Sequence, residues 1–427
     1  MPDIKLRDGE VTVYTRADSP SYWVGIHLPN GGRLQKSLRT KKVEDARERA
    51  IKLYDELVWR DRLGLTQETK TFAEAAKAWL KHLAGDVRAG VRNSRNLADY
   101  EPVLTRYLLP FFGDKAIDSI KQPDVERYKI WRRDYWITGP GSKEQQVYQR
   151  HGKAVVSNKR HKKAAPSAST VNGENTVLRG VFKHAVTQGW LTKEQLPTVE
   201  NIEITQRDAR ERAYPMFAMD EYRQLRRFMT KWVKEEDINQ RERWRREATQ
   251  DFLLILFNSG MREHELFKRD EKSKEWRGVR WKDVELFVSK GGCELVCFNI
   301  PENTKTGARA VVPMRAVRYV LERRKLRCPD AKPNDFVLAM PDGSLVNTFA
   351  SSVQRLYKLA GLLSCPKTGR NRGIYSGRHS YATARIRDNL NPAALAANMG
   401  TSIAMLQRSY YHFDAKAEAD SLTGRKS

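Results

Sequence analysis

Hydrophobic residues at the start of the chain first alternate with polar ones in short runs and then recur at helical spacing. The alternation predicts three strands, Glu10–Thr15, Tyr22–Leu28 and Arg33–Leu38. Between the second and third runs lies a strong hairpin-turn signal, Pro29-Asn30-Gly31-Gly32. The helical spacing covers Val43 to about Leu63. We therefore expect a three-stranded sheet backed by one helix.

Helical periodicity resumes after a linker-like segment at residues 64–71. It predicts four helices, Phe72–Leu83, Leu97–Leu109, Gln122–Trp136 and Ala168–Gln188. Pro110 and Gly113 are expected to stop the second helix and Gly189 to cap the last, because proline lacks a backbone N–H and glycine favours helix ends. The pattern indicates an all-α domain.

The connection before the last of these helices, residues 137–167, is long and basic. It carries one acidic residue, Glu144, and seven basic ones, Lys143, Arg150, Lys153, Lys159, Arg160, Lys162 and Lys163. A loop of this length inside a compact domain tends to be functional or disordered. Because a block of like charge needs a counter-charge to become ordered, we expect these residues to contact DNA phosphate.

Helical and strand-like segments alternate after a second linker-like stretch at residues 196–214. A buried helix, Thr249–Asn258, breaks at Ser259-Gly260, and two strand-like runs, Glu294–Ile300 and Ala310–Pro313, flank a Lys-Thr-Gly turn. Further helical stretches are expected at 314–326, 347–361, 377–388 and 392–409. The pattern predicts a multidomain, mainly α chain with small β-sheets and a mixed α+β last part, divided into residues 1–65, 71–195 and 212–427.

The charge of the chain points to a polyanionic partner. Its 427 residues include 78 Lys and Arg against 52 Asp and Glu, a net charge of +26. Nucleic acid is the first candidate because basic residues occur in every region, and the alternative is a basic protein without such a partner. No long apolar run or basic amphipathic anchor indicates a membrane, and the charged first residues lack the apolar stretch of a signal peptide. We expect an intracellular protein.

Two smaller patterns bear on ligands. The exposed face of the predicted N-terminal sheet is expected to carry Arg16, Arg33, Lys36 and Arg39. Such a face suits a β-ribbon in a DNA groove, and an ordinary solvated face is an equal alternative. The four cysteines fit no ligand spacing with histidine partners, so we expect reduced structural thiols and no metal site.

The C-terminal part of the chain holds the residue types that metal-free attack on a phosphodiester requires. Attack places negative charge on the non-bridging oxygens, and guanidinium groups suit its neutralisation because they are planar, bidentate and permanently charged. Arg262 follows a helix break and Arg378 opens another helix, so two elements could converge on one phosphate. Either alone would more commonly be a surface or ion-pair arginine. Glu265, on the same helical face as Arg262, could hold its guanidinium.

The remaining roles need an acid and a nucleophile. Lys305, at the tip of a predicted β-hairpin, could protonate the leaving 5′ oxygen, although a solvated turn lysine is the alternative. Tyr410 or Tyr411 qualifies as the hydroxyl that forms a covalent phosphoester. Serine and cysteine candidates lack a recognisable neighbouring base or elbow motif.

Taken in order, these segments resemble the tyrosine recombinases, the phage integrase family. The resemblance is carried by four blocks: Gly260-Met261-Arg262-Glu263-His264-Glu265-Leu266, Thr304-Lys305-Thr306-Gly307 with Val311-Val312-Pro313, Tyr375 through Thr383, and Met399-Gly400-Thr401 followed by Tyr410-Tyr411-His412. They are similar to the family's first-arginine box, hairpin lysine, second-arginine box and closing nucleophile segment. The helical domain resembles the core-binding domain, and the N-terminal sheet more weakly resembles an arm-type DNA-binding module.

The resemblance implies a role for each block. Arg262 and Arg378 would clamp the scissile phosphate, and Lys305 would act as general acid. The nucleophile would be Tyr410, because the family's tyrosine commonly stands two residues before a histidine, here His412. The implied 3′-phosphotyrosyl intermediate conserves bond energy, so neither a cofactor nor a metal is needed.

Two positions depart from the commonest family pattern. Tyr375 stands where a histidine is usual, three residues before the second arginine, and Thr401 stands where His or Trp is common. A tyrosine hydroxyl can donate or accept a hydrogen bond but is a poor base at neutral pH. His379 is expected to pack in the helix or to support its neighbours rather than to replace the base.

The resemblance implies a site-specific recombinase or integrase that integrates or excises a mobile element. It would act as a homotetramer on double-stranded DNA attachment sites in the bacterial cytoplasm, at the nucleoid, with accessory DNA-bending or directionality proteins as further partners and no membrane. Two alternatives remain. One is a type IB topoisomerase, which shares the chemistry but relaxes supercoils as a monomer. The other is a DNA-binding regulator with a decayed catalytic centre, which Tyr375 and Thr401 leave open.

Overall fold

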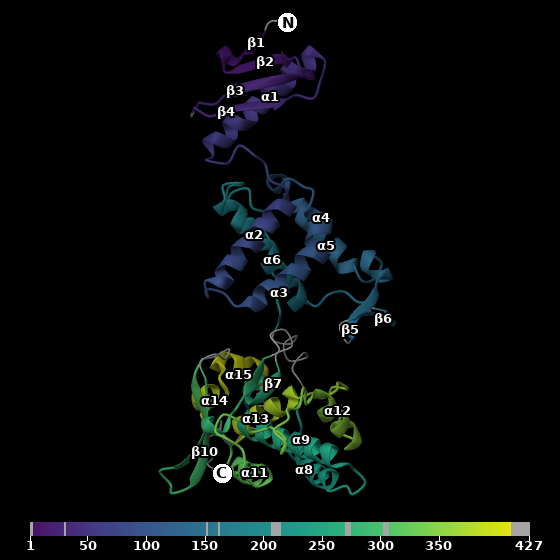
Figure 1. Ribbon diagram of the computed structural model, residues 1–427, viewed down its shortest axis with the longest axis vertical. Helices are drawn as coiled ribbons and strands as arrows, with labels where there is room; N and C mark the ends of the chain where they lie inside the picture. The colour runs from purple at the N-terminus through teal and green to yellow at the C-terminus, as the bar shows by residue number, and fades with distance from the viewer. Residues whose placement is uncertain are drawn as a thin grey trace, which may run out of the picture. The chain divides into compact units, whose positions relative to one another are not determined.

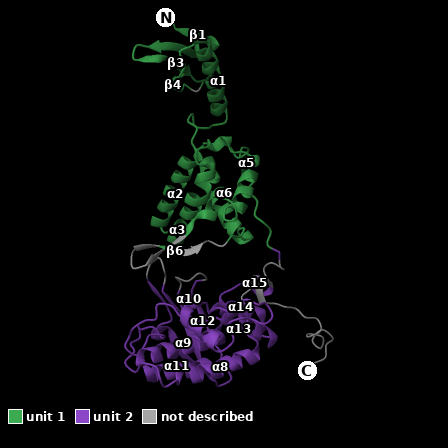
Figure 2. Cartoon of the chain, turned by 90° about the vertical axis from the view of Figure 1, so that its right-hand side faces the viewer, with its two compact units in different colours: residues 1–204 green, residues 205–427 purple. Residues whose placement is uncertain are grey.

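The computed structural model describes residues 3–29, 31–150, 153–160, 163–205, 215–269, 275–301 and 307–410. At residues 146–150, 153–155, 157–160 and 408–410 it describes the backbone alone. The chain divides into two compact units, residues 1–204 and 205–427 (Figure 2), and each unit has hydrophobic cores of its own.

The first unit begins with a four-stranded antiparallel sheet in the order β1-β2-β3-β4, backed by helix α1 (Figure 1). The elements are β1 (Ile4–Leu6), a 3₁₀ turn (Arg7–Gly9), β2 (Val11–Arg16), β3 (Ser19–His27), β4 (Arg33–Ser37) and α1 (Val43–Arg62). Alternate residues of the strands, such as Val13 and Val24, are buried with Ala46 and Ala50 of the helix. The predicted sheet and helix are confirmed. The structure adds β1, whose three residues are too few to show alternation.

A helical bundle follows. Its elements are α2 (Phe72–Arg88), α3 (Ser94–Val103), a π turn (Leu104–Leu108), α4 (Leu109–Phe112), a 3₁₀ turn (Ile117–Ser119), α5 (Gln122–Asp134) and α6 (Ala168–Thr187). A capping box opens α2, in which the Thr71 N–H donates to the Glu74 carboxylate at 2.8 Å and the Glu74 N–H donates to the Thr71 hydroxyl at 3.2 Å. Helices α2 and α6 pack so closely that a Cβ on Gly180 would lie 2.3 Å from the Trp79 ring.

The predicted helix stop at Pro110 is wrong. Just before it the helix widens into the π turn, where the Leu109 N–H donates to the Leu104 carbonyl. Pro110 then stands in the first turn of α4, a position at which a helix needs no N–H from it. The helical backbone continues to Phe112 and ends at Gly113, as expected.

The predicted loop at residues 137–167 contains a β-hairpin. After a 3₁₀ turn (Pro140–Lys143), β5 (Gln145–Arg150) pairs antiparallel with β6 (Lys153–Arg160). Val147 pairs with Val156, and Tyr148 with Val155. These residues have high strand propensity, but they are so few among the charged residues of the segment that the pattern indicated a loop.

The described part of the second unit combines helices with two small antiparallel sheets, β11-β10-β9 and β7-β8. Its elements are α8 (Met219–Val233), α9 (Gln240–Ser259), α10 (Glu263–Leu266), β7 (Phe267–Arg269), β8 (Trp276–Gly278), a 3₁₀ turn (Trp281–Asp283), β9 (Val284–Val288), β10 (Glu294–Ile300), β11 (Arg309–Val311), α11 (Ala316–Arg327), α12 (Ala350–Leu359), α13 (Tyr375–Arg387), α14 (Pro392–Met399) and α15 (Ile403–Tyr410). The stretch predicted as one helix at 392–409 is two, because Gly400 adopts a left-handed conformation with φ +62°.

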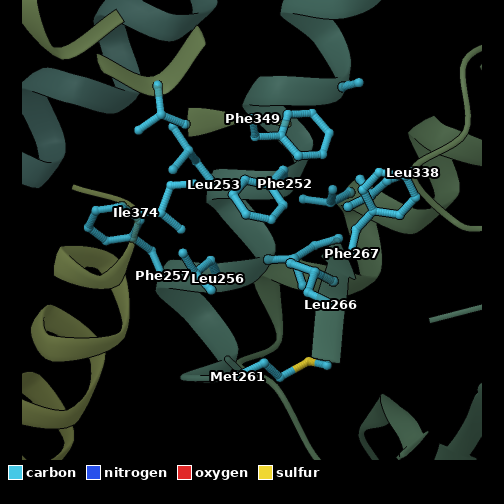
Figure 3. Close-up of a cluster of buried hydrophobic side chains, with 14 of the residues drawn as sticks. Phe252, Leu253, Leu256, Phe257, Met261, Leu266, Phe267, Leu338, Phe349 and Ile374 are labelled. Atoms are coloured by element: carbon cyan, nitrogen blue, oxygen red, sulfur yellow. The ribbon is translucent and has the colours of Figure 1, made fainter. Parts of the chain in front are cut away.

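The core of the second unit forms around the C-terminal half of α9. Phe252, Leu253 and Leu256 of this helix lie in one buried cluster with side chains from later elements, including Phe349 and Ile374 (Figure 3). Met261 and Leu266 belong to the same cluster. Because these two apolar residues flank Arg262 in the sequence, the burial of apolar surface fixes the backbone that carries this arginine.

Candidate active site

Arg262 is positioned by a tight break after α9. Gly260 ends that helix with φ +65°, and a Cβ at this position would lie 2.3 Å from the Tyr381 ring, so glycine is needed for both reasons. Arg262 is the N-cap of α10. Its backbone N–H donates to Glu265 Oε2 at 2.8 Å and its Nη1 donates to Glu265 Oε1 at 2.7 Å. The predicted link between Arg262 and Glu265 is therefore present.

Arg378 reaches the same place from α13. Its side chain is buried, and its Nη1 donates to the carbonyl of Gly260 at 2.6 Å and to that of Met399 at 2.9 Å. It thus joins the end of α9 to the end of α14. Charged hydrogen bonds of this kind are stronger than neutral ones, which favours a single orientation of the guanidinium.

The two arginines converge on one corner of the backbone. Arg262 Nη2 donates to the carbonyl of Gly400, and Arg378 donates to that of the preceding residue, Met399. These carbonyls lie at the C-terminal end of α14, where the helix dipole favours positive charge. The structure therefore brings together two guanidinium groups that are 116 residues apart in the sequence.

A third arginine, Arg309, completes this cluster. From the start of β11 its Nη2 and Nη1 donate to the two carboxylate oxygens of Glu265 at 2.7 and 3.1 Å. Burial by itself raises the pKa of the Glu265 carboxyl, but the hydrogen bonds and charge of Arg309, together with the hydrogen bonds from Arg262, outweigh it, so the pKa lies below its ordinary value. Glu265 is ionised at neutral pH and balances one of the positive charges.

Sequence reasoning missed Arg309. Four residues after Lys305 and just before an apolar run, it resembles any edge-strand arginine. The contact that distinguishes it joins residues far apart in the chain. The structure shows a contact at Gly400, where a Cβ would lie 2.7 Å from the Arg309 guanidinium carbon, so glycine leaves room for this side chain.

Tyr375 lies beside an open pocket of about 480 Å³. Polar residues that line the pocket with it include Glu263, Lys268, Arg269, Asn347 and Thr348. The ring of Tyr375 is 6.1 Å, centre to centre, from that of His379, which is buried in α13. His379 thus lies within the packed helix, as expected, and the pocket opens beside the tyrosine.

The other predicted catalytic residues are described to different extents. Thr401 is half-buried directly after the Gly400 corner, and its N–H donates to the Ala396 carbonyl at 2.9 Å. Tyr410 is the last residue of α15, and its side chain lies outside the described atoms. Lys305, Tyr411 and His412 lie outside the described residues. Their roles remain predictions.

The open face of the N-terminal sheet carries only part of the predicted basic set. Arg16 stacks 3.8 Å from the Trp23 ring centre and donates to Gln35 Oε1 at 2.8 Å. Strand register places Arg33 on this same face, but pairs Lys36 with the buried Val24 and so places it on the helix-side face. The prediction of one shared face is wrong for Lys36. Arg39 is exposed beyond β4, with φ +49°.

The basic residues of the hairpin region are placed mainly by their backbone. Arg150 lies in β5, and Lys153, Lys159 and Arg160 lie in β6, with side chains outside the described atoms. The exposed residues Lys143 and Lys163 flank the hairpin, and Lys162 lies outside the described residues.

Among the helices that the structure describes, none is both long and apolar enough to cross a membrane.

The fold is similar to those of solved DNA-bound integrases. A fragment of the Tn1549 transposon integrase in complex with a circular intermediate DNA matches with a TM-score of 0.52 at 15% identity, covering 84% of this chain and all of that one. A lambda integrase dimer bound to a COC′ core site matches with a TM-score of 0.51 at 14% identity, covering 94% of this chain and 96% of that one.

No protein-family model and no curated protein matches the chain by sequence. At the identities given above, the structural likeness concerns the fold. It confirms the fold that the resemblance implied. The chain has the fold of the tyrosine recombinases.

Proposed function

We propose that this protein is a site-specific DNA recombinase that cleaves and rejoins DNA through a 3′-phosphotyrosine intermediate. One observation carries the proposal: the buried Arg262 and Arg378, from separate elements, donate to the adjacent carbonyls of Gly400 and Met399. Guanidinium groups held in place before the reaction stabilise the charge that develops on a five-coordinate phosphorus without reorganising. The net charge of +26 supports DNA as the substrate.

In the proposed reaction the Tyr410 hydroxyl attacks the scissile phosphorus. The bond between phosphorus and the 5′ oxygen breaks, and that oxygen takes a proton from Lys305. The proton of Tyr410 passes to water, and Tyr375 hydrogen-bonds the phosphate rather than acting as a base. The phosphotyrosine ester conserves the energy of the broken bond. A 5′ hydroxyl of a second DNA end can therefore displace the tyrosine without a cofactor.

The same proposal extends to the whole protein. Residues 1–65, 71–195 and 212–427 act as an arm-type DNA-binding module, a core-binding domain and a catalytic domain, a division supported by the separate hydrophobic cores. The N-terminal module and the basic hairpin region contact DNA away from the cleaved bond. The protein assembles as a homotetramer on two attachment sites and integrates or excises a mobile element in the bacterial cytoplasm. Accessory DNA-bending or directionality proteins assist it.

Covalent capture of DNA tests this function. The full-length protein is incubated with nicked duplexes of randomised sequence, so that cleavage next to the nick releases a short fragment and traps the protein on DNA. Adducts are recovered under denaturing conditions and sequenced, and the captured duplex then serves as the substrate for variants. We expect wild type to form an adduct that is absent in Tyr410→Phe and retained in Tyr411→Phe. Arg262→Ala and Arg378→Ala should each slow its formation by on the order of 100-fold or more.

The outcomes separate the three functions. An adduct that survives Tyr410→Phe and is lost in Tyr411→Phe assigns the nucleophile to Tyr411. Relaxation of supercoiled plasmid that lacks the captured sequence favours a type IB topoisomerase. Sequence-specific binding with no adduct from wild type contradicts the proposal and favours a DNA-binding regulator.

A further inference from the structure

Arg309 lies beside the two arginines that are proposed to bind the scissile phosphate. Its side chain is 10% exposed, and both oxygens of the Glu265 carboxylate accept hydrogen bonds from it. Its Nε also donates to the carbonyl of Asn398 at 3.3 Å. The absence of a side chain at Gly400 leaves the space that its guanidinium fills.

These contacts connect Arg309 to both arginines of the site. Glu265 is the carboxylate that binds Arg262, so the fork from Arg309 fixes the orientation of that carboxylate. Asn398 and Gly400 flank Met399, whose carbonyl accepts from Arg378. Loss of Arg309 would therefore loosen both groups that hold the two arginines, namely the Glu265 carboxylate that binds Arg262 and the backbone corner at residues 398–400 that binds Arg378.

A second tie reinforces the corner. The Val312 N–H, three residues after Arg309, donates to Asn398 Oδ1 at 2.8 Å, and Asn398 Nδ2 donates to the Val312 carbonyl at 3.3 Å. Strand β11 and the end of α14 are thus joined by the side chain of Arg309 and by that of Asn398. The backbone corner at residues 398–400 accepts hydrogen bonds from Arg262 and Arg378, and these contacts anchor it to β11, the strand that follows Lys305 in the sequence.

Stability alone does not account for this cluster. Well-packed apolar residues often replace a buried ion pair with no loss of stability. The contacts of the described residues place the guanidinium groups of Arg262 and Arg309 on one carboxylate and that of Arg378 on the same backbone corner. Guanidinium groups gathered in this way are suited to an anionic ligand.

We propose that Arg309 is a positioning residue, which holds Glu265 and the 398–400 corner so that Arg262 and Arg378 meet the two non-bridging oxygens of one phosphate. The inference deepens the proposed recombinase function and rests on it for the identity of the phosphate as a DNA phosphodiester. It predicts that loss of Arg309 slows cleavage by a larger factor than it weakens the affinity for DNA.

The test compares Arg309→Met and Arg309→Lys with a matched control, Arg324→Met. Arg324 is another buried arginine of the same unit, which donates to the carbonyls of Val337 and Ala339 and forms an ion pair with Asp251 at 3.7 Å. Among the described residues it has no hydrogen bond or ion pair with Arg262, Glu265, Arg309 or Arg378. Single-turnover cleavage of the captured duplex, affinity for that duplex and thermal unfolding are measured for each. We expect Arg309→Met to cleave on the order of 100-fold more slowly, with a loss of affinity for the duplex of only about tenfold. Arg309→Lys should restore the thermal unfolding temperature of wild type but not its full cleavage rate, since lysine lacks the two parallel N–H donors of the guanidinium group.

A substrate with a methylphosphonate at the scissile position separates positioning from general structure. This substitution removes the charge that the arginines neutralise, so the rate ratio of wild type to Arg309→Met should fall toward one. Cleavage by Arg309→Met at the wild-type rate would overturn the inference. If Arg324→Met cleaves as slowly as Arg309→Met, Arg309 has only a structural role. The same conclusion follows if the methylphosphonate leaves the rate ratio of wild type to Arg309→Met unchanged.

Binding of inorganic phosphate gives a readout that does not depend on cleavage. The measurement is the phosphate concentration that gives a set increase in unfolding temperature. Wild type and Arg324→Met should need the same concentration. Arg309→Met should need at least about tenfold more, because its charged hydrogen bonds to phosphate are weaker. If wild type forms no DNA adduct while this difference holds, the recombinase function fails and the positioning role stands. Equal phosphate binding by wild type and Arg309→Met overturns the positioning role.

Discussion

The carboxylate of Glu265 lies between two arginines and is wholly shielded from solvent. Ionised, it satisfies donors of both guanidinium groups. Protonated, it would leave two positive charges close together in a buried site, which is costly. The folded state therefore favours the ionised form, in agreement with the lowered pKa of this carboxyl.

The lowered pKa of Glu265 makes part of the stability dependent on pH. A folded pKa below the ordinary value of about 4.3 means that the contribution is complete above about pH 4.3 and disappears as pH falls through the folded pKa. At pH 7 we expect Glu265→Gln to be less stable than wild type by about 3 kcal/mol, because one partner of a buried ion pair is lost. Urea unfolding between pH 7 and 3 should show this difference shrinking below about pH 4.3. A difference that is constant with pH would contradict the assignment.

Residue identities showed part of this site in advance. The link between Arg262 and Glu265 was predictable from their spacing of three residues, although the structure forms it as a contact across the N-cap of α10 rather than on a helical face. Arg309 was not, because its contact with Glu265 spans 44 residues and arises only when β11 packs beside α10. Local spacing predicts local pairs, whereas long-range pairs depend on how the elements pack.

Packing between α2 and α6 depends on one glycine. Gly180 of α6 faces the Trp79 ring, whereas Gly173 of the same helix has no atom within 4 Å of where its Cβ would be. Glycine lowers the stability of an exposed helix interior. The close approach of the Trp79 ring explains the glycine at position 180, whereas no contact explains the glycine at position 173.

Alanine at these two positions should have opposite effects. Gly180→Ala forces the Trp79 ring to move and should reduce the free energy of unfolding by about 1–3 kcal/mol. Gly173→Ala meets no neighbour and should increase it by roughly 0.5–1 kcal/mol through the lower entropy of the unfolded chain. Urea unfolding of the full-length variants, followed by tryptophan fluorescence, measures both. A loss of stability in Gly173→Ala, or none in Gly180→Ala, would show that the helices do not pack as described.

Helices with an apolar face were the most predictable elements. The predictions for α1 and α6 ended within one residue of the observed bounds, since their periodicity is long and their ends are marked by turn or cap residues. The π turn before Pro110 and the β5–β6 hairpin were missed. Each depends on a few residues whose local signals, a proline and a block of charge, favoured another conformation.

At the scale of the whole molecule, groups suited to DNA occur in both compact units. The second unit holds the arginine cluster, and the first holds the open sheet face with Arg16, Trp23 and Arg33 as well as the basic hairpin region. For the proposed recombinase, DNA affinity is a sum over separate contacts on one chain, and each phosphate contact contributes to its dependence on salt. Composition predicts a polyanionic partner, but only strand register decides which side of the sheet each basic residue occupies.

Arg33 and Lys36 form a matched pair for testing this surface, because each lies in β4 and is exposed, but on opposite faces of the sheet. Affinity of the full-length protein for duplex DNA is measured over a range of salt concentrations. If the open face contacts phosphate, Arg33→Ala should reduce the slope of log affinity against log salt by about one, and Lys36→Ala should leave it unchanged. Equal reductions in both variants would mean that the charge of the module acts at a distance. A reduction confined to Lys36→Ala would place DNA on the helix side of the sheet.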